Sequence, residues 1–417
     1  MVSRFLSVTA LALRQLLACV ASVCLLMIGG TVYASQPEFD LGERPAYLVD
    51  DMDEGALKAS LLACRDQSVS QSQFSISHRG APLRYPEHTI ESYTAAARQG
   101  AGKMECDVTF TRDRELVCRH SQCDLHTTTN ILQTPLAKTC VEPFQPADPE
   151  NGKPATAKCC TSELNLDEFR SLQGRMDKVN PQATSIEEYL QVSAAEVPQP
   201  VLLAGRLITH RESIQLFKKL KVNFIPELKG ASVPMPYEGE YSQADYARQL
   251  VEDYIAAGIA PEQVWLQSFD LQDLIFWNKH YPDFAKQAIL LDRRMVLDQS
   301  YAPSLADFQE KYAQGVRTIA PPLFALVSLN EDGDIVPSEY AQLAKQAGLK
   351  FITWSLERSG PLSEGGGFYY ITIKDVINND GDVFKLVDAL VKEVGVMGIF
   401  SDWPATTTYY ANCMGLD

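Results

Sequence analysis

Short β-prone runs alternate with helix-forming segments eight times along this chain, and this alternation constrains its fold more than any other feature. The runs occupy residues 75–80, 103–110, 222–230, 264–269, 288–291, 318–320, 351–356 and 397–404. Strands joined through helices lie parallel in one sheet, and eight such units close into a barrel. We therefore expect an α/β fold, a (β/α)8 barrel of the TIM type that spans residues 74–410.

Polar side chains gather in the first two runs and just after them. The first run ends in His78 and Arg79, and in the second the two-residue period of a strand places Glu105 and Asp107 on one face. Adjacent carboxylates repel each other unless a cation lies between them, so a divalent ion is one explanation and solvated surface acids are the other. His120 ends the next β-prone run, and together with His78 it could supply an acid and a base near neutral pH.

The order of these motifs resembles the glycerophosphodiester phosphodiesterase family. The matching motifs are His78-Arg79-Gly80, Pro86-Glu87-His88-Thr89, Glu105-Cys106-Asp107, the strand ending in His120, Glu227-Leu228-Lys229, Gln267-Ser268-Phe269 and the closing Gly398-Ile399-Phe400-Ser401-Asp402-Trp403-Pro404. The resemblance extends from about Ser75 to Pro404. The family usually has asparagine at the position of His88, so the role of His88 is left open.

The resemblance implies a metal-dependent enzyme that hydrolyses glycerophosphodiesters to glycerol 3-phosphate and an alcohol. Two-histidine acid/base catalysis and a cyclic phosphate intermediate are implied with it. Carried onto this chain, the implied residues are the catalytic pair His78 and His120, the metal ligands Glu105, Asp107 and Glu227, and the phosphate contacts Arg79 and Lys229. Because the ligands are carboxylates and include no cysteine, the single divalent cation should be calcium or magnesium. Phe269 and Trp354, on later strands, are expected to line the substrate pocket.

Two other classes of function are compatible with a barrel of this kind. A sugar-phosphate isomerase or aldolase would need a base or a Schiff-base lysine that acts on carbon, and Lys229 is the obvious candidate. A secreted binding or structural protein on an inactive barrel is the other class. The intact set of histidines and carboxylates argues against it. Release of glycerol 3-phosphate from glycerophosphocholine by the purified protein would separate the three classes.

The first 34 residues have the pattern of a secretory signal peptide. Arg4 and Arg14 precede an apolar run over residues 16–28, and small residues lead to a cleavage site after Ala34. A retained membrane anchor is the alternative, since the uncharged stretch is just long enough to span a bilayer. We expect cleavage, an exported protein that is periplasmic or secreted, and no stable membrane insertion afterwards.

Eight cysteines remain after such a cleavage, and an even number in an exported chain indicates disulfides. Four of them, Cys123, Cys140, Cys159 and Cys160, lie in residues 121–185, a segment with little periodicity. We predict an insertion here that is braced by disulfides among these four and caps the active-site mouth. Cys106 faces away from the two neighbouring acids, so it should be buried and could stay unpaired. His126, within the insertion, is expected to be structural.

The formal net charge of −16 narrows the choice of partners. Loss of the first 34 residues would make it more negative, because they contain two arginines and no acid. A chain this acidic, without a basic cluster, is a poor ligand for nucleic acid or anionic membranes. The expected partner is a small-molecule glycerophosphodiester, whose phosphate must be bound by a local positive site.

Overall fold

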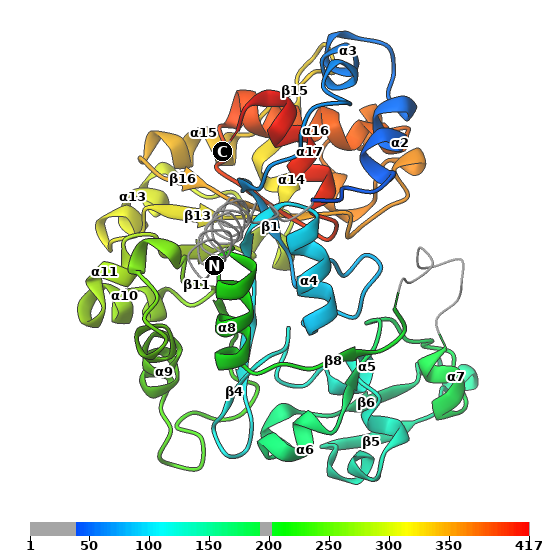
Figure 1. Cartoon of the computed structure of the whole chain (residues 1–417), viewed down its shortest axis with the longest axis vertical. Coiled ribbons are helices and arrows are strands. Elements are labelled where there is room, and N and C mark those ends of the chain that lie inside the picture. Colours follow the sequence, from blue (N-terminus) through cyan, green and yellow to red (C-terminus); the bar gives the residue numbers. More distant parts are fainter. Residues whose placement is uncertain (1–38, 192–201, 417) are drawn as a thin grey trace, which may run out of the picture. The chain divides into compact units, whose positions relative to one another are not determined.

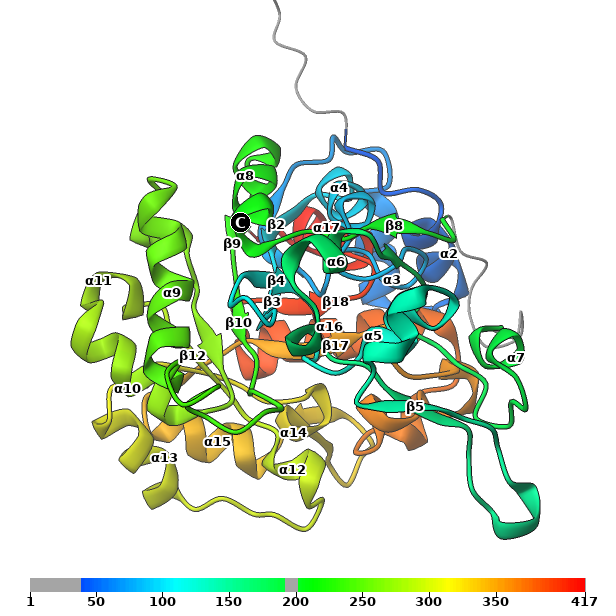
Figure 2. The same ribbon diagram turned by 90° about the horizontal axis from the view of Figure 1, so that it is seen from below.

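A computed structural model describes residues 39–191 and 202–416. Its centre is a closed barrel of parallel strands (Figures 1 and 2). In chain order the eight strand positions are β1 (Ser72–Ser77), β2 (Ala101–Met104) with β3 (Asp107–Phe110), β9 (Asn223–Phe224) with β10 (Glu227–Leu228), β11 (Gln267–Ser268), β12 (Ile289–Leu291), β13 (Thr318–Ala320), β16 (Lys350–Phe351) with β17 (Thr353–Leu356), and β18 (Ile399–Ser401). Strand β1 pairs in parallel with both β2 and β18, which closes the barrel and confirms the predicted fold.

Helices cover the outside of the strands (Figure 1). They are α4 (Ile90–Arg98), α8 (His210–Leu220), α9 (Gln243–Ala256), α10 (Leu271–His280), α11 (Pro282–Ala285), α13 (Leu305–Ala313), α14 (Leu323–Leu326), α15 (Glu339–Gln346), α16 (Val383–Ala389) and α17 (Ala405–Met414). The short helix α12 (Arg294–Leu297) has no buried residue and follows β12. Polar N-caps set where several begin. Thr89 accepts a hydrogen bond from Ser92 at the start of α4, and Ser242 forms a capping box with Asp245 at the start of α9.

Most residues of the strands are buried, as expected of parallel strands that helices cover on the outside. The barrel interior is filled by Ile76, Ile225, Ile289, Leu291, Ala320, Ile352 and Phe400. A larger core fills the space between the strands and the helices. Side chains at the carboxyl ends of the strands therefore stand on a closely packed base.

Two short helices, α2 (Arg44–Asp51) and α3 (Ala56–Ala63), precede the barrel. A disulfide between Cys64 and Cys413 joins the end of α3 to α17, the last helix. Within the described residues, no helix combines the length and the apolar character needed to cross a bilayer. The predicted signal peptide and its alternative, a retained anchor, lie outside the described residues.

The insertion has a small hydrophobic core of its own. It contains α5 (Leu125–Thr128), β5 (Glu142–Gln145), β6 (Thr156–Lys158), α6 (Leu166–Arg170), β7 (Gln173–Gly174), α7 (Ile186–Leu190) and β8 (Gly205–Arg206) (Figures 1 and 2). Disulfides Cys123–Cys160 and Cys140–Cys159 confirm the predicted bracing.

The predicted end of the insertion, residue 185, is too early. The sequence predicts the return of the barrel after a helix over residues 185–194, of which 192–194 lie outside the described residues. The structure has a shorter helix, α7, whose buried Tyr189 packs into the core of the insertion. Strand β8 then pairs with β7, so the insertion continues to Arg206. A helical period shows which face of a helix is buried, but not which core buries it.

Candidate active site

The turn after β1 presents His78 and Arg79 at the carboxyl end of that strand, as predicted. Arg79 has φ 59° and Gly80 has φ 98°, a left-handed pair that reverses the chain. A Cβ at Gly80 would lie 2.3 Å from Ser92 Oγ, so only glycine fits there. The turn also directs the Arg79 backbone N–H toward Glu105, to which it donates a 3.0 Å hydrogen bond.

Strand register brings three carboxylates together. Glu227 on β10 lies opposite Asp107 on β3, and on its other side it lies opposite Gln267 on β11. Glu105 stands at the break between β2 and β3, where it accepts a 2.9 Å hydrogen bond from Gln267 Nε2. Oxygens of Glu105, Asp107 and Glu227 all lie within 4.8 Å of one another, and all three residues are buried.

These three acids, the acid cluster, shift one another's ionisation. Burial and then the charge of Asp107 raise the pKa of Glu105 well above its usual value. Burial raises the pKa of Glu227 to about 7, against the opposing effect of Lys229. Burial alone would also raise the pKa of Asp107, but Lys229 and His88 hold it well below its usual value. The cluster therefore contains more negative charge than the neighbouring cations neutralise.

A divalent cation fits this donor set. Asp107 Oδ1 is buried and has no hydrogen-bond donor among the described residues, and Lys229 is the cation that faces Glu227 Oε1. An oxygen-only set of carboxylates is the ligand type that calcium and magnesium prefer.

Two cations flank the acid cluster. Lys229 Nζ lies 2.5 Å from Glu227 Oε1, while Arg79 pairs with Glu87 at 2.9 Å and approaches Asp107 at 3.6 Å. Burial would lower the pKa of Lys229, but Glu227 raises it overall. A protonated lysine cannot form a Schiff base, which argues against an aldolase-type reaction. Glu87 was part of a matched motif, but we assigned it no role.

His88, whose role the sequence left open, is fully buried. Its Nε2 lies 2.9 Å from Asp107 Oδ2 and its Nδ1 lies 2.7 Å from the Tyr93 hydroxyl. His88 therefore fixes the position of the Asp107 carboxylate through its contact with Oδ2. Tyr93 is a further residue that the sequence did not reveal, because nothing in its spacing distinguishes it from a core aromatic.

A chain of polar contacts supports His78. Its Nδ1 lies 2.5 Å from Asp402 Oδ1, and the other oxygen of Asp402 accepts a 2.7 Å hydrogen bond from Arg358 Nε. Arg358 also reaches Asp177 of the insertion at 3.3 Å. Burial, then Arg79, lower the pKa of His78 to about 4, although Asp402 opposes the shift. The other ring nitrogen, Nε2, lies on the side of Glu105, 4.0 Å from its Oε2.

His120 reaches the site by a different route. It follows β4 (Leu116–Cys118), which folds back antiparallel on β3, outside the parallel barrel. The backbone N–H of Arg119 donates a 2.8 Å hydrogen bond to the carbonyl of Asp107 and fixes this segment beside the acid cluster. Burial, then Arg79 and Lys229, lower the pKa of His120 well below its usual value.

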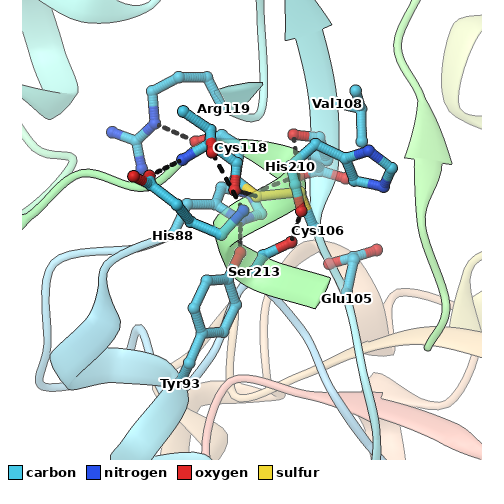
Figure 3. The surroundings of a disulfide bond; sticks show 12 residues. His88, Tyr93, Glu105, Cys106, Val108, Cys118, Arg119, His210 and Ser213 are labelled. Atoms are coloured by element: carbon cyan, nitrogen blue, oxygen red, sulfur yellow. Dashed lines mark hydrogen bonds and ion pairs between the residues drawn. A yellow bond between two sulfur atoms is a disulfide. The ribbon is translucent and has the colours of Figure 1, made fainter. Parts of the chain in front are cut away.

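Cys106 is not a free thiol: it forms a disulfide with Cys118 (Figure 3). The expected outward, buried position is correct, but the fold-back of β4 brings Cys118 to the same outer face. Strand alternation predicts the direction of Cys106 and cannot show which residue lies opposite it. This bond links the strand that carries Glu105 and Asp107 to the segment that carries His120.

The predicted site residues surround one cavity of about 940 Å³. It is lined by His78, Arg79, Glu105, His120, Glu227, Lys229, Phe269 and Trp354, while Asp107 lies beneath it in the acid cluster. Phe269 and Trp354 meet edge to face with centroids 6.1 Å apart. Among the described residues, the insertion contributes only Ser121 to the lining, so the lining does not support the predicted cap. His126, as expected, is structural and stacks on Tyr189.

Comparisons with known proteins agree with this geometry. The model of the glycerophosphoryl diester phosphodiesterase family matches residues 78–406. A protein from Arthroderma benhamiae named "Extracellular protein" is 44% identical over 245 residues, 58% of this chain and 100% of the relative. A "Probable glycerophosphodiester phosphodiesterase 1" from Mycobacterium tuberculosis is 44% identical over 57 residues, 14% of this chain and 21% of the relative.

A solved structure has the same fold. The crystal structure of a putative glycerophosphoryl diester phosphodiesterase from Silicibacter pomeroyi superposes with a TM-score of 0.56 at 20% identity, covering 86% of this chain and 99% of that one. At this identity the likeness shows the fold, and the match of the family model over most of the chain shows the family. The chain belongs to the glycerophosphoryl diester phosphodiesterase family and is a phosphoric diester hydrolase.

Proposed function

We propose that this enzyme hydrolyses glycerophosphodiesters to glycerol 3-phosphate and an alcohol with the help of one divalent cation and two histidines. The observation that carries the proposal is the convergence of His78, His120 and the acid cluster on one cavity. An acid, a base and a charge-neutralising centre are the parts that cleavage of a phosphodiester requires.

Glu105, Asp107 and Glu227 are the residues that would hold the cation, calcium or magnesium. When bound, it would offset the negative charge of the phosphodiester and of the ligands themselves. Arg79 and Lys229 add positive charge at the edge of the same site, where burial strengthens their effect on a phosphate.

The glycerol 2-hydroxyl is the proposed nucleophile. One histidine takes its proton while its oxygen bonds to phosphorus, and the other histidine protonates the oxygen of the departing alcohol as the bond to phosphorus breaks. Water then opens the cyclic phosphate with the two histidines in exchanged roles. Attack from within the same molecule can remove about 7–11 kcal/mol of the barrier in well-oriented cases.

A substrate with hydrogen in place of the 2-hydroxyl tests this route. It should bind as an inhibitor, because its phosphate and alcohol are intact, and it should turn over negligibly. Hydrolysis of this analogue at a rate near that of glycerophosphocholine would contradict the cyclic route and favour direct attack by water. The His78→Asn and His120→Asn variants, assayed with the natural substrate, would show whether both histidines are needed.

We also propose that the protein is exported, with a signal peptide removed after Ala34. The proposal is supported by the four disulfides and by the similarity to a protein named extracellular. N-terminal sequencing of the protein recovered from a secreting host should begin at Ser35. A chain that starts at Met1 in the membrane fraction would favour the retained anchor instead.

A further inference from the structure

The cavity wall carries one more cation than the proposed mechanism uses. Arg293 lines the cavity just after β12, as Lys229 does after β10 and Phe269 after β11. These three strands are neighbours in the barrel. The three side chains therefore lie in order along one wall, with Lys229 nearest the acid cluster and Arg293 farthest from it.

Arg293 differs from the other cavity cations in having no anionic partner. Within residues 39–191 and 202–416, no carboxylate pairs with its guanidinium, and the side chain is exposed. The adjacent Asp292 is already occupied, since it binds Arg294 at 2.5 Å and accepts a 2.8 Å hydrogen bond from the Tyr340 hydroxyl. The guanidinium is thus available to a ligand.

One aromatic ring positions Arg293 relative to the acid cluster. Lys229 Nζ lies 5.9 Å from the centre of the Phe269 ring, and Arg293 Cζ lies 5.1 Å from the same centre. A ring face attracts a cation more weakly than a carboxylate does, so Arg293 is held in place without being neutralised.

We propose that Arg293 forms an anion subsite for the alcohol half of the substrate, so that the enzyme favours glycerophosphodiesters whose alcohol carries a carboxylate or a second phosphate. This inference rests on the proposed function. The planar guanidinium can bind either group through two parallel hydrogen bonds. A cavity of about 940 Å³ is at the upper end of small-ligand sites and has room for such an alcohol beside glycerol phosphate.

Asp273 also lines the cavity, but it is buried and accepts hydrogen bonds from Gln243 and Ser268. The exposed Asp270 is therefore the competing charge on the same wall, and it would attract a cationic alcohol. Its carboxylate already accepts a 2.8 Å hydrogen bond from the Gln272 backbone at the start of α10. Arg293 has no such interaction, so we assign the dominant charge preference to Arg293.

The test compares kcat/KM for glycerophosphodiesters of glycerol, glycolate, inositol phosphate and choline. These alcohols are neutral, carboxylate-bearing, phosphate-bearing and cationic. The kcat/KM for the anionic substrates, divided by the kcat/KM for the neutral substrate, should fall about five- to tenfold in Arg293→Gln, because one charge-assisted contact is lost. Arg293→Lys should restore part of it, and Arg293→Glu should shift the preference toward choline. The glycolate and inositol phosphate substrates show which anionic group is bound.

Arg98→Gln is the matched control. Arg98 is an exposed arginine at the end of α4, which leads into the amino end of β2 and so lies at the opposite end of the barrel. Its loss changes the net charge equally and should leave the substrate ratio as in the wild type. If no glycerophosphodiester is hydrolysed, the proposed function is wrong. If the neutral substrate is hydrolysed but the ratio does not respond to Arg293→Gln or Arg293→Glu, or if choline is preferred, only the anion subsite is wrong.

Discussion

Replacement of Asp402 by asparagine should separate the orientation of His78 from the rest of catalysis. Asp402 contacts His78 Nδ1 at 2.5 Å inside a buried site. A hydrogen bond to a charged group contributes about 1.5–3 kcal/mol, and asparagine of the same shape loses the charge while filling the space. If that contribution is made in the transition state, kcat should fall by about 10- to 100-fold.

The same substitution also weakens the contact with Arg358, so stability must be measured beside activity. We expect a loss of about 1–3 kcal/mol in the free energy of unfolding, since Arg358 keeps its contact with Asp177. Arg358→Gln is the control: it removes the ion pair but leaves the carboxylate on His78, and its kcat should fall far less. Calorimetric titration with magnesium should give a similar affinity for Asp402→Asn and the wild type, because Asp402 lies outside the acid cluster. A kcat for Asp402→Asn close to that of the wild type would refute the orienting role.

Three further predictions concern the metal, a disulfide and a buried acid. Chelation should abolish activity and either calcium or magnesium should restore it, whereas Glu105→Gln should weaken calorimetric binding of either ion; full activity after thorough chelation would contradict metal dependence. Replacing Cys106 and Cys118 by serine should lower the free energy of unfolding by about 3 kcal/mol, the value for a loop closed over 12 residues, as measured by denaturant titration. Burial raises the pKa of Asp124 from 3.8 to about 6, so its contribution to stability is present below pH 3.8 and is lost as the pH rises through about 6. Asp124→Asn should therefore gain stability relative to the wild type over that interval, and a constant difference across it would be inconsistent with the raised pKa.

The sequence predicts the barrel and most of the residues around its cavity because both depend on local patterns. Strand ends follow from β-prone runs and glycine turns, and in a parallel barrel all such ends meet at one face. His78 and Glu227 are far apart in the chain, yet each stands at a strand end that a short motif identifies. The predicted barrel fold alone is enough to predict that these two residues lie at the same face.

The roles that the sequence did not reveal depend on contacts across the closed barrel. Asp402 supports His78 across 324 positions, a pairing that arises only because β18 lies beside β1. Arg358 belongs to none of the matched motifs. Its position depends on two partners from separate segments, Asp402 and Asp177. The pairing of Cys106 with Cys118 likewise depends on how β4 folds back, which strand alternation does not specify.

If the protein is exported as proposed, the disulfide between Cys106 and Cys118 would make the active site depend on the compartment. In the cytosol thiols are kept reduced, so a chain that has not yet been exported would lack the link between the ligand-bearing strand and His120. We expect such a chain to hold its ligands and His120 less firmly, and to spare the phosphodiesters of the cell that makes it. Full activity would then require formation of this disulfide, and it would therefore arise only after export from the cytosol.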